Sequence, residues 1–470
     1  MRRILRLATV VLAVCFLRLS SVYAASWDFA PYLEIKESYT DNVMLATNGL
    51  RQSDYITEIN PGFALNSSGP NSFFNMAYRY QTLQYLDNTS QDTQYHKANL
   101  AFKHNIWDKY VTLDALASYN QSIVSEQSGV PANNLFISSN RTNTANYQIS
   151  PLFKWEYDAN TLMAVRPSYG EVKYLDLNNQ DSKIVQTLAL IDRKAEPGRM
   201  GWWTGFQQRR QQLESEGVIN LQRYDVGIRL PVTTRTQWVV SGGKEKNIVN
   251  DVDIVPEGKA GFWDIGFKWQ PMPRSTISTG TGKRFFGNTY RLELEHHTRR
   301  TVWNASYHQE LQSSSLALQP LQLRGQVEQV QQFPAVEGIQ TISNELYLSK
   351  TFSASATWQG SQTVVNFGLI SDQRDFQITP NTQKTHGGQL NYVWKITPKS
   401  DLNISVNIQK TDYVQSQRQD DSRAFDARLE SKISRRISGE IRYYKTVFNS
   451  NLDNFDYQAY LFTLGLIGTF

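Results

Sequence analysis

The chain has 470 residues, of which 40% are hydrophobic, 12% aromatic and 19% charged, and its formal net charge is +5. Its mean hydropathy of −0.48 is too polar for a bundle of membrane helices, and its aromatic content is too high for a disordered chain. The length suits about two or three soluble domains, or one large barrel. The positive charge favours a nucleic-acid partner only if it lies in the folded part of the chain.

Residues 1–24 are expected to be a signal peptide that is cleaved after Ala24. Three arginines among the first six residues precede an apolar run over residues 4–17, and small residues follow that run. An uncleaved anchor is one alternative, although the run falls short of the about 20 apolar residues that span a bilayer. Lipidation of Cys15 is another, and Val14 before it is not the small residue that this modification requires.

Cleavage changes what the totals mean for the mature chain, residues 25–470. Cys15 is the only cysteine, so the mature chain has no disulfide, no cysteine metal site and no thiol nucleophile. Four arginines leave with the signal peptide, which reduces 48 basic residues to 44 against 43 acidic ones. We therefore expect no nucleic-acid partner.

Apolar and polar residues alternate along most of the mature chain. Between residues 402 and 409, leucine, isoleucine and valine occupy the even positions and polar residues the odd ones, and 223–230, 263–269, 290–295 and 425–430 behave alike. The alternating segments reach about 11–15 residues, against about 5–6 for strands of soluble sheets. A soluble β-sandwich would show the same two faces, but this strand length favours tilted membrane-spanning strands.

Two kinds of connection separate these segments. Short turns are predicted at 69–71, 158–160, 196–198, 271–273 and 398–400, and mostly longer polar loops at 42–53, 124–141, 248–258, 314–341 and 413–421. Outer-membrane barrels have short periplasmic turns and long extracellular loops. We therefore predict an all-β fold, a single transmembrane antiparallel up-and-down β-barrel of about 22 strands (range about 18–22), with both termini in the periplasm.

The end of the chain and its tryptophans support this prediction. The last eleven residues place five apolar residues on one face, which resembles the C-terminal signal for insertion of outer-membrane barrels. The residues of this predicted signal are Tyr460, Phe462, Leu464, Leu466 and Phe470. Tryptophans near the predicted strand ends indicate an aromatic girdle at the membrane interface. The girdle residues are Trp27, Trp107, Trp155, Trp202, Trp269, Trp303 and Trp394.

Three prolines lie inside predicted strands, although a closed barrel has no free edge to accommodate them. Pro151 and Pro167 are equidistant from the turn at 158–160, so they should face each other across one hairpin, and Pro61 lies in the second strand. We expect either a β-bulge or a local gap in the hydrogen-bond ladder at these positions.

Motifs for catalysis or metal binding are absent from the sequence or weak. The six histidines lack H-E-x-x-H spacing, and the G-T-G-K stretch at 280–283 lacks the rest of a phosphate loop. Asp251, Asp253 and Glu257 could bind calcium, but without an EF-hand frame they are expected to form a solvated acidic loop. We expect no cofactor, no metal and no enzyme activity, although a Ser–His–acid set from distant strands stays open.

Fifteen charged residues fall on the polar face, which would line the lumen. Because both signs are interleaved, they indicate a neutral or weakly selective hydrophilic path, and pairing across strands to stiffen the wall is the alternative interpretation. The Gln-rich loop 314–341 is long enough to fold inward as a constriction. The predicted lumen-lining residues are Arg79, Arg166, Arg223, Asp225, Arg229, Asp264, Lys268, Arg291, Glu293, Glu295, Asp426, Arg428, Glu430, Lys432 and Arg442.

Several short motifs follow one another in a specific order. They are Y-T-D-N at 39–42, D-Y-I-T-E-I-N-P-G at 54–62, N-N-L at 133–135, S-N-R-T at 139–142 and Y-Q-I-S-P at 147–151. With them the chain resembles a family of outer-membrane β-barrels associated with the PEP-CTERM/exosortase system of exopolysaccharide-producing Gram-negative bacteria. The match is densest between residues 27 and 175. The resemblance implies an outer-membrane barrel and no catalytic residues.

These observations favour a passive outer-membrane pore or conduit that serves polysaccharide export or surface-protein assembly. A non-conducting scaffold that binds a polysaccharide or a partner protein through its loops is the second hypothesis, and a barrel hydrolase the third. The expected partners are outer-membrane lipid and lipopolysaccharide, the barrel-assembly machinery, and a polysaccharide.

Overall fold

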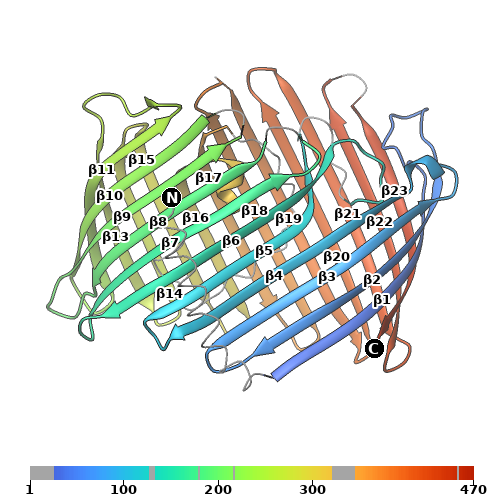
Figure 1. Cartoon of the computed structure of the whole chain (residues 1–470), viewed down its shortest axis with the longest axis horizontal. Coiled ribbons are helices and arrows are strands. Elements are labelled where there is room, and N and C mark those ends of the chain that lie inside the picture. Colours follow the sequence, from blue (N-terminus) through green and yellow to red (C-terminus); the bar gives the residue numbers. More distant parts are fainter. Residues whose placement is uncertain are drawn as a thin grey trace, which may run out of the picture.

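The computed structural model describes residues 26–125, 133–177, 180–214, 217–319, 345–379, 381–452 and 455–470. These residues form one antiparallel sheet that closes on itself (Figure 1). The predicted signal peptide lies outside the described residues. None of the helices in the described ranges has the length and apolar character to span a membrane.

Within the described ranges the sheet has 23 strands, accompanied by two short helices. The strands are β1 Ser26–Thr40, β2 Asp54–Ser68, β3 Ser72–Tyr85, β4 Thr93–Trp107, β5 Val111–Ile123, β6 Arg141–Glu156, β7 Thr161–Tyr174, β8 Ser182–Arg193, β9 Gly201–Leu213, β10 Gly217–Pro231, β11 Thr236–Val249, β12 Val252–Asp253, β13 Gly261–Met272, β14 Ser275–Arg284, β15 Gly287–His297, β16 Thr301–Gln312, β17 Tyr347–Gln359, β18 Thr363–Phe376, β19 Thr382–Thr397, β20 Ser400–Tyr413, β21 Arg418–Lys432, β22 Ile437–Ser450 and β23 Tyr457–Thr469. The helices are η2 Thr89–Gln91 and α2 Ser314–Ala317.

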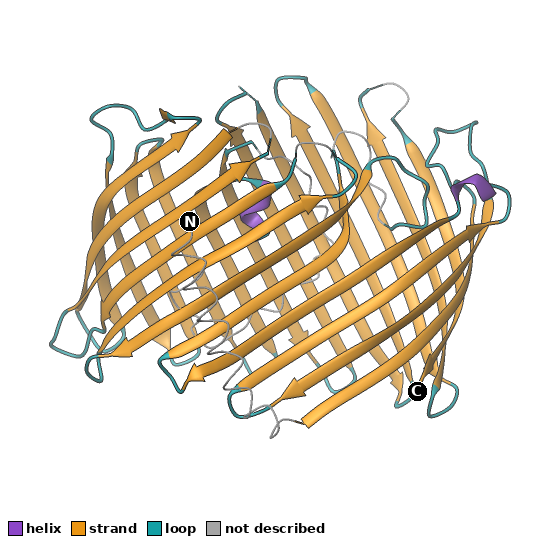
Figure 2. Cartoon of the chain, in the orientation of Figure 1, coloured by secondary structure: helices purple, strands orange, loops and turns teal. Residues whose placement is uncertain are grey.

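The wall of the barrel has the predicted 22 strands. The remaining strand, β12, is two residues long and pairs only with the end of β11, while β11 continues its pairing with β13. Closure comes from β1 and β23, which pair antiparallel from Tyr32 opposite Thr469 to Thr40 opposite Leu461. The long tilted strands and the closed outline are visible in Figure 2.

The barrel has two edges that differ in their connections. We call the edge with the start of β1 and the end of the chain the Phe470 edge, and the opposite one the loop edge (Figure 1). All five predicted turns lie at the Phe470 edge, and the described parts of the predicted loops begin and end at strand ends of the loop edge. The loop predicted at 413–421 is shorter than expected, because β20 and β21 continue pairing up to Tyr413 opposite Arg418.

Contacts between distant strands identify the inner face of the wall. Arg209 on β9 and Glu310 on β16 are not neighbours in the sheet, yet their side chains approach to 3.1 Å. Such a contact is possible only inside a closed barrel. The opposite face carries exposed apolar residues such as Val226, Ile265 and Ile408, as expected for a wall that faces lipid.

The prolines interrupt the ladders as predicted. Between β6 and β7 the pairing stops at Ile149 and resumes at Phe153 in the same register, so Pro151 and Pro167 face each other in a local gap rather than a bulge. Pro61 has a similar gap on its β3 side. The other neighbours of these prolines pair without interruption.

Candidate functional site: the barrel lumen

The pairing registers place all fifteen predicted lumen residues on the inner face of the wall. Most of them form ion pairs within the wall, which is the structural role weighed above. Asp225 instead accepts a hydrogen bond from the Trp203 indole at 2.8 Å. Lys268, Glu293, Glu430 and Lys432 have no ion pair with a described residue.

Several ion pairs on the inner face join strands that are not adjacent. Each such pair connects the two neighbours of one strand and passes over that strand on the inner face, and we call these pairs strand-skipping pairs. Their closest N–O distances are 2.5 to 3.8 Å. They are Glu34–Arg79, Asp114–Arg166, Asp192–Arg229, Glu245–Arg284, Asp264–Arg291 and Glu440–Lys36.

Two strand-skipping pairs span the strands that contain the ladder gaps. Glu34 and Arg79 belong to β1 and β3 and pass over β2, which contains Pro61. Asp114 and Arg166 belong to β5 and β7 and pass over β6, which contains Pro151. The ion pairs therefore connect the wall where backbone hydrogen bonds are missing.

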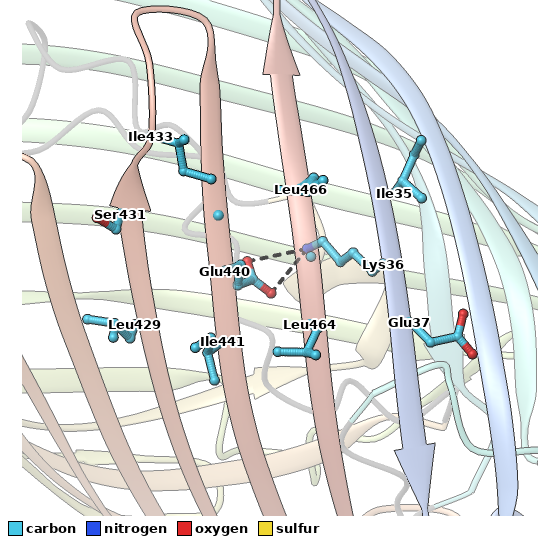
Figure 3. A pocket seen from close by; sticks show the side chains of 12 residues that line it. Ile35, Lys36, Glu37, Leu429, Ser431, Ile433, Glu440, Ile441, Leu464 and Leu466 are labelled. Carbon is cyan, nitrogen blue, oxygen red and sulfur yellow. Dashed lines mark hydrogen bonds and ion pairs between the residues drawn. The ribbon is translucent and has the colours of Figure 1, made fainter.

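The seam between β1 and β23 is crossed in the same way. Lys36 Nζ lies 3.4 Å from Glu440 Oε1 and passes over Gly465, where a Cβ atom would come within 3.1 Å of the Lys36 chain (Figure 3). A larger side chain at Gly465 would press against this pair. The same part of the wall has an apolar recess lined by outward residues such as Leu464 and Ile441.

A segment after β16 fills part of the lumen near the loop edge. Leu316 of α2 is buried among inner residues of β7 and β8. Gln319 is fully buried, and its side-chain amide donates to Asn146 Oδ1 at 3.0 Å. Ser313 Oγ donates to Gln211 at 2.7 Å. Residues 313–319 therefore fold inward, while the rest of the predicted constriction, 320–341, lies outside the described residues.

A second segment, residues 133–140, fills the lumen on another side. Leu135 and Phe136 are buried against inner residues of β3, β22 and β23, and the Phe136 ring lies 6.3 Å from that of Tyr444. Tyr85 donates a hydrogen bond to the Leu135 carbonyl at 3.0 Å. Two inward segments therefore occupy part of the loop-edge half of the lumen, and sequence periodicity did not predict their contacts.

The inner face near the Phe470 edge is different. Five of its charged side chains are exposed, and we call the region that they form the vestibule. It contains three acids and two lysines, so these residues do not form a single-sign ring. The vestibule residues are Lys268, Glu293, Glu295, Glu430 and Lys432.

The outer face near the Phe470 edge has the predicted aromatic border. All seven predicted girdle tryptophans are exposed, and each lies at the end of its strand nearest this edge. Tyr460, Phe462, Leu464 and Leu466 face outward on β23, and Phe470 follows this strand and is exposed. Rings at such a border suit the headgroup level of a membrane.

Two hydrogen-bonded pairs near the end of β15 contain a serine, two histidines and an acid, but they lie on opposite faces of the wall. Ser275 Oγ lies 2.7 Å from His296 Nδ1 on the outer face, and Glu295 contacts His297 on the inner face. Consecutive strand residues point to opposite faces, so the two pairs do not combine. The described residues also contain no group of three or more His, Cys, Asp or Glu that could hold a metal ion. Asp253 in the acidic loop accepts the Val255 amide.

No protein-family model and no curated protein matches the chain. Among solved structures, the FrpB iron transporter of Neisseria meningitidis (F5-1 variant) matches with 8% identity and a TM-score of 0.51, over 94% of this chain and 83% of that chain. A mutant of the ferric enterobactin receptor of Pseudomonas aeruginosa matches with 9% identity and a TM-score of 0.50, over 94% and 81%. A loop-deletion mutant of OmpT, an outer membrane protein of Vibrio cholerae, matches with 10% identity and a TM-score of 0.34, over 95% of this chain and 100% of that chain. At these identities the likeness concerns the fold: the chain is a closed antiparallel barrel of the outer-membrane type.

Proposed function

We propose that the chain is an outer-membrane barrel whose lumen is a passive conduit, with the Phe470 edge and both termini in the periplasm. The observation that carries the proposal is a closed wall with an apolar outer face and a charged inner face that is exposed in the vestibule. The tryptophan border and the outward apolar face of β23 support membrane insertion. Separation of inner and outer membranes by density, followed by detection of the chain, tests its location.

A polysaccharide is the proposed cargo. Support comes from the resemblance over residues 27–175 and from a lumen that mixes both signs with amides such as Asn407 and Gln389, because a hydroxyl-rich polymer needs hydrogen-bond partners more than net charge. Current block by soluble polysaccharide added at the Phe470 edge tests this proposal. Equal block by a small neutral osmolyte would contradict it.

The packing of the loop-edge half favours a second candidate, a barrel that conducts nothing and acts as a scaffold. Leu316 and Phe136 are each 2% exposed inside the lumen, so at least two sides of it are occupied by protein. The conduit therefore requires that one or both of these segments move aside, whereas the scaffold requires that they stay.

Conductance in planar bilayers separates the two candidates. The double variant Leu316→Ser with Gln319→Ala removes the apolar anchor and the amide anchor of residues 313–319, and Gln389→Ala on the inner face of β19 is the control. Current that is larger in the double variant than in the wild type and the control supports a conduit restricted by this segment. No current from any of them, even after deletion of 314–341, rejects the conduit in favour of the scaffold.

A further inference from the structure

The outer face of the wall has a basic area near the loop edge. The outward positions of β9, β10, β11, β13 and β14 contain four cationic residues and no aspartate or glutamate. All four are exposed, and none forms an ion pair with a described residue. We call them the basic patch, and they are Arg210, Lys244, Lys246 and Lys283.

Several outward cations elsewhere near the loop edge form ion pairs with neighbouring acids. Lys350 lies 2.8 Å from Asp375, and Arg423 makes two contacts with Asp421 at 2.8 and 2.9 Å. Lys410 lies 3.8 Å from Asp412. The cations of the basic patch differ from these, because they form no ion pair with a described residue. The acids of the loop between β11 and β13, Asp251, Asp253 and Glu257, also form none with them.

Uncharged amides lie among the cations. The registers place Gln208 and Gln222 in one row with Lys246, and Asn220 opposite Arg210. Gln208 donates to Asn220 at 3.1 Å, which leaves other donors and acceptors of both side chains free for a ligand. Cations next to amides suit a headgroup that carries both phosphate and hydroxyl groups.

Aromatic and apolar residues border the patch on the side toward the middle of the wall. Tyr224 lies opposite Lys244, and Trp263 lies opposite Lys283; both rings are about half exposed. Val226, Val240 and Ile265 continue the outer face beyond them. The five strands together span about 19 Å at the usual strand spacing, enough for the headgroup of a lipid whose acyl chains lie along the apolar part.

Two glycines lower the surface inside the patch. Gly261 lies opposite Lys244, and a Cβ atom there would meet only a backbone oxygen at 3.9 Å, so the space beside the lysine is open. Gly242 lies opposite Trp263. A headgroup can therefore approach the backbone between the cations.

We propose that the basic patch binds a lipid with a phosphorylated sugar headgroup, of the lipid A type, in the leaflet that meets the loop edge. The cations contact its phosphates, the amides its hydroxyl groups, and the residues around Val240 its acyl chains. The inference rests on the membrane location in the proposed function but not on conduction, and it identifies the leaflet at the loop edge as the outer one.

Binding of lipid A to the purified full-length protein in detergent tests the proposal, with native mass spectrometry to count bound lipid and a titration to give Kd. The patch variant carries glutamine at positions 210, 244, 246 and 283. The matched control carries glutamine at 350, 410 and 423, where the cations have acidic partners. Retention of the folded form on unheated gels shows that both variants are intact.

We expect wild type and control to bind alike, and the patch variant to bind at least about tenfold more weakly, since each surface cation adds attraction to anionic headgroups. Dephosphorylated lipid A should bind all three proteins equally weakly. Equal loss in the control, or phosphatidylglycerol binding as tightly as lipid A, would overturn the proposal. So would inorganic phosphate competing at concentrations comparable to lipid. Lys244→Gln alone, with a smaller loss in the same direction, guards against misfolding of the fourfold variant.

Discussion

The two halves of the lumen differ in the residues that the same wall presents on its inner face. Near the loop edge, inner residues such as Ile56, Leu83 and Leu461 are fully buried under segments that fold inward. Near the Phe470 edge, inner residues are charged, exposed and bounded by strand-skipping pairs. Apolar burial contributes to the first half, together with buried ion pairs such as Arg418–Asp420 and Glu245–Arg284. The vestibule charges of the second half lie in a hydrated space, where ion pairs are weaker. Buried apolar side chains and exposed charges are thus concentrated at different ends of the strands.

The largest effect is expected where apolar packing is removed from the loop-edge half. Phe136→Ala should weaken the attachment of residues 133–140 to the wall by about 3 kcal/mol, because it leaves a cavity against Tyr444. Hydrogen exchange measured by mass spectrometry should show faster exchange in this segment and none in β21. An equal increase in both halves would contradict the division described here.

A smaller loss is expected at a strand-skipping pair. Asp114→Asn leaves Arg166 without its carboxylate next to the ladder gap, and should lower the free energy of unfolding by about 1–3 kcal/mol. Asp426→Asn, which breaks the pair with Arg442 beside an intact ladder, is the control and should cost about 1 kcal/mol. Urea unfolding in lipid vesicles, followed by tryptophan fluorescence, measures both. Equal losses would show that the gap needs no spanning pair.

Removing vestibule charges should change the ion selectivity of the lumen more than it changes the free energy of unfolding. Lys268→Gln with Lys432→Gln should change the free energy of unfolding by less than about 0.5 kcal/mol, because neither lysine has an ion-pair partner among the described residues. If the lumen conducts, the reversal potential in a salt gradient should move toward cation preference, and Glu293→Gln with Glu430→Gln should move it the other way. If neither double variant shifts the reversal potential, these charges do not lie on the ion path.

The smallest effect is expected in a turn at the Phe470 edge. The Asn160 backbone amide, helped by Thr161, holds the pKa of Asp158 below its ordinary value of 3.8. A carboxylate with a lowered pKa stabilises the folded state above its ordinary pKa, and this contribution is lost as the pH falls through the lowered value. Asp158→Asn should therefore lower the urea midpoint slightly at pH 7 and not at a pH near 2. A difference that persists in acid would assign the effect to the turn geometry instead.

Period-two alternation predicts which side chains point into the lumen and which point outward, because this depends only on the residue's position along its own strand. It placed Arg79 and Arg442 on the inner face. The position of Pro151 relative to the turn predicted that it faces Pro167 with either a bulge or a ladder gap, and the structure has the gap. It did not show which charges would meet. Glu34, Asp114 and Asp192 also alternate inward, but their partners depend on registers two strands away.

The contacts of the two inward segments could not be predicted from local sequence patterns, for a different reason. Gln319 is buried because Asn146, far away in the sequence, and the bare Gly170 provide a place for it. The Gln-rich composition of the loop indicated length and polarity only, and residues 133–140 contain no feature that distinguishes an inward fold from an outward loop. Contacts of this kind follow from the closed barrel and not from the segment itself.

The strand-skipping pairs have a geometric consequence for the barrel. Ladder hydrogen bonds resist sliding of neighbouring strands but leave the angle between them adjustable. An ion pair on the concave side between a strand and its second neighbour acts as a chord across the arc of the wall, and it holds the local curvature. Six such chords lie at β2, β6, β9, β13, β14 and β23. The residues that make the lumen polar thereby also set its cross-section, and loss of a chord flattens its sector.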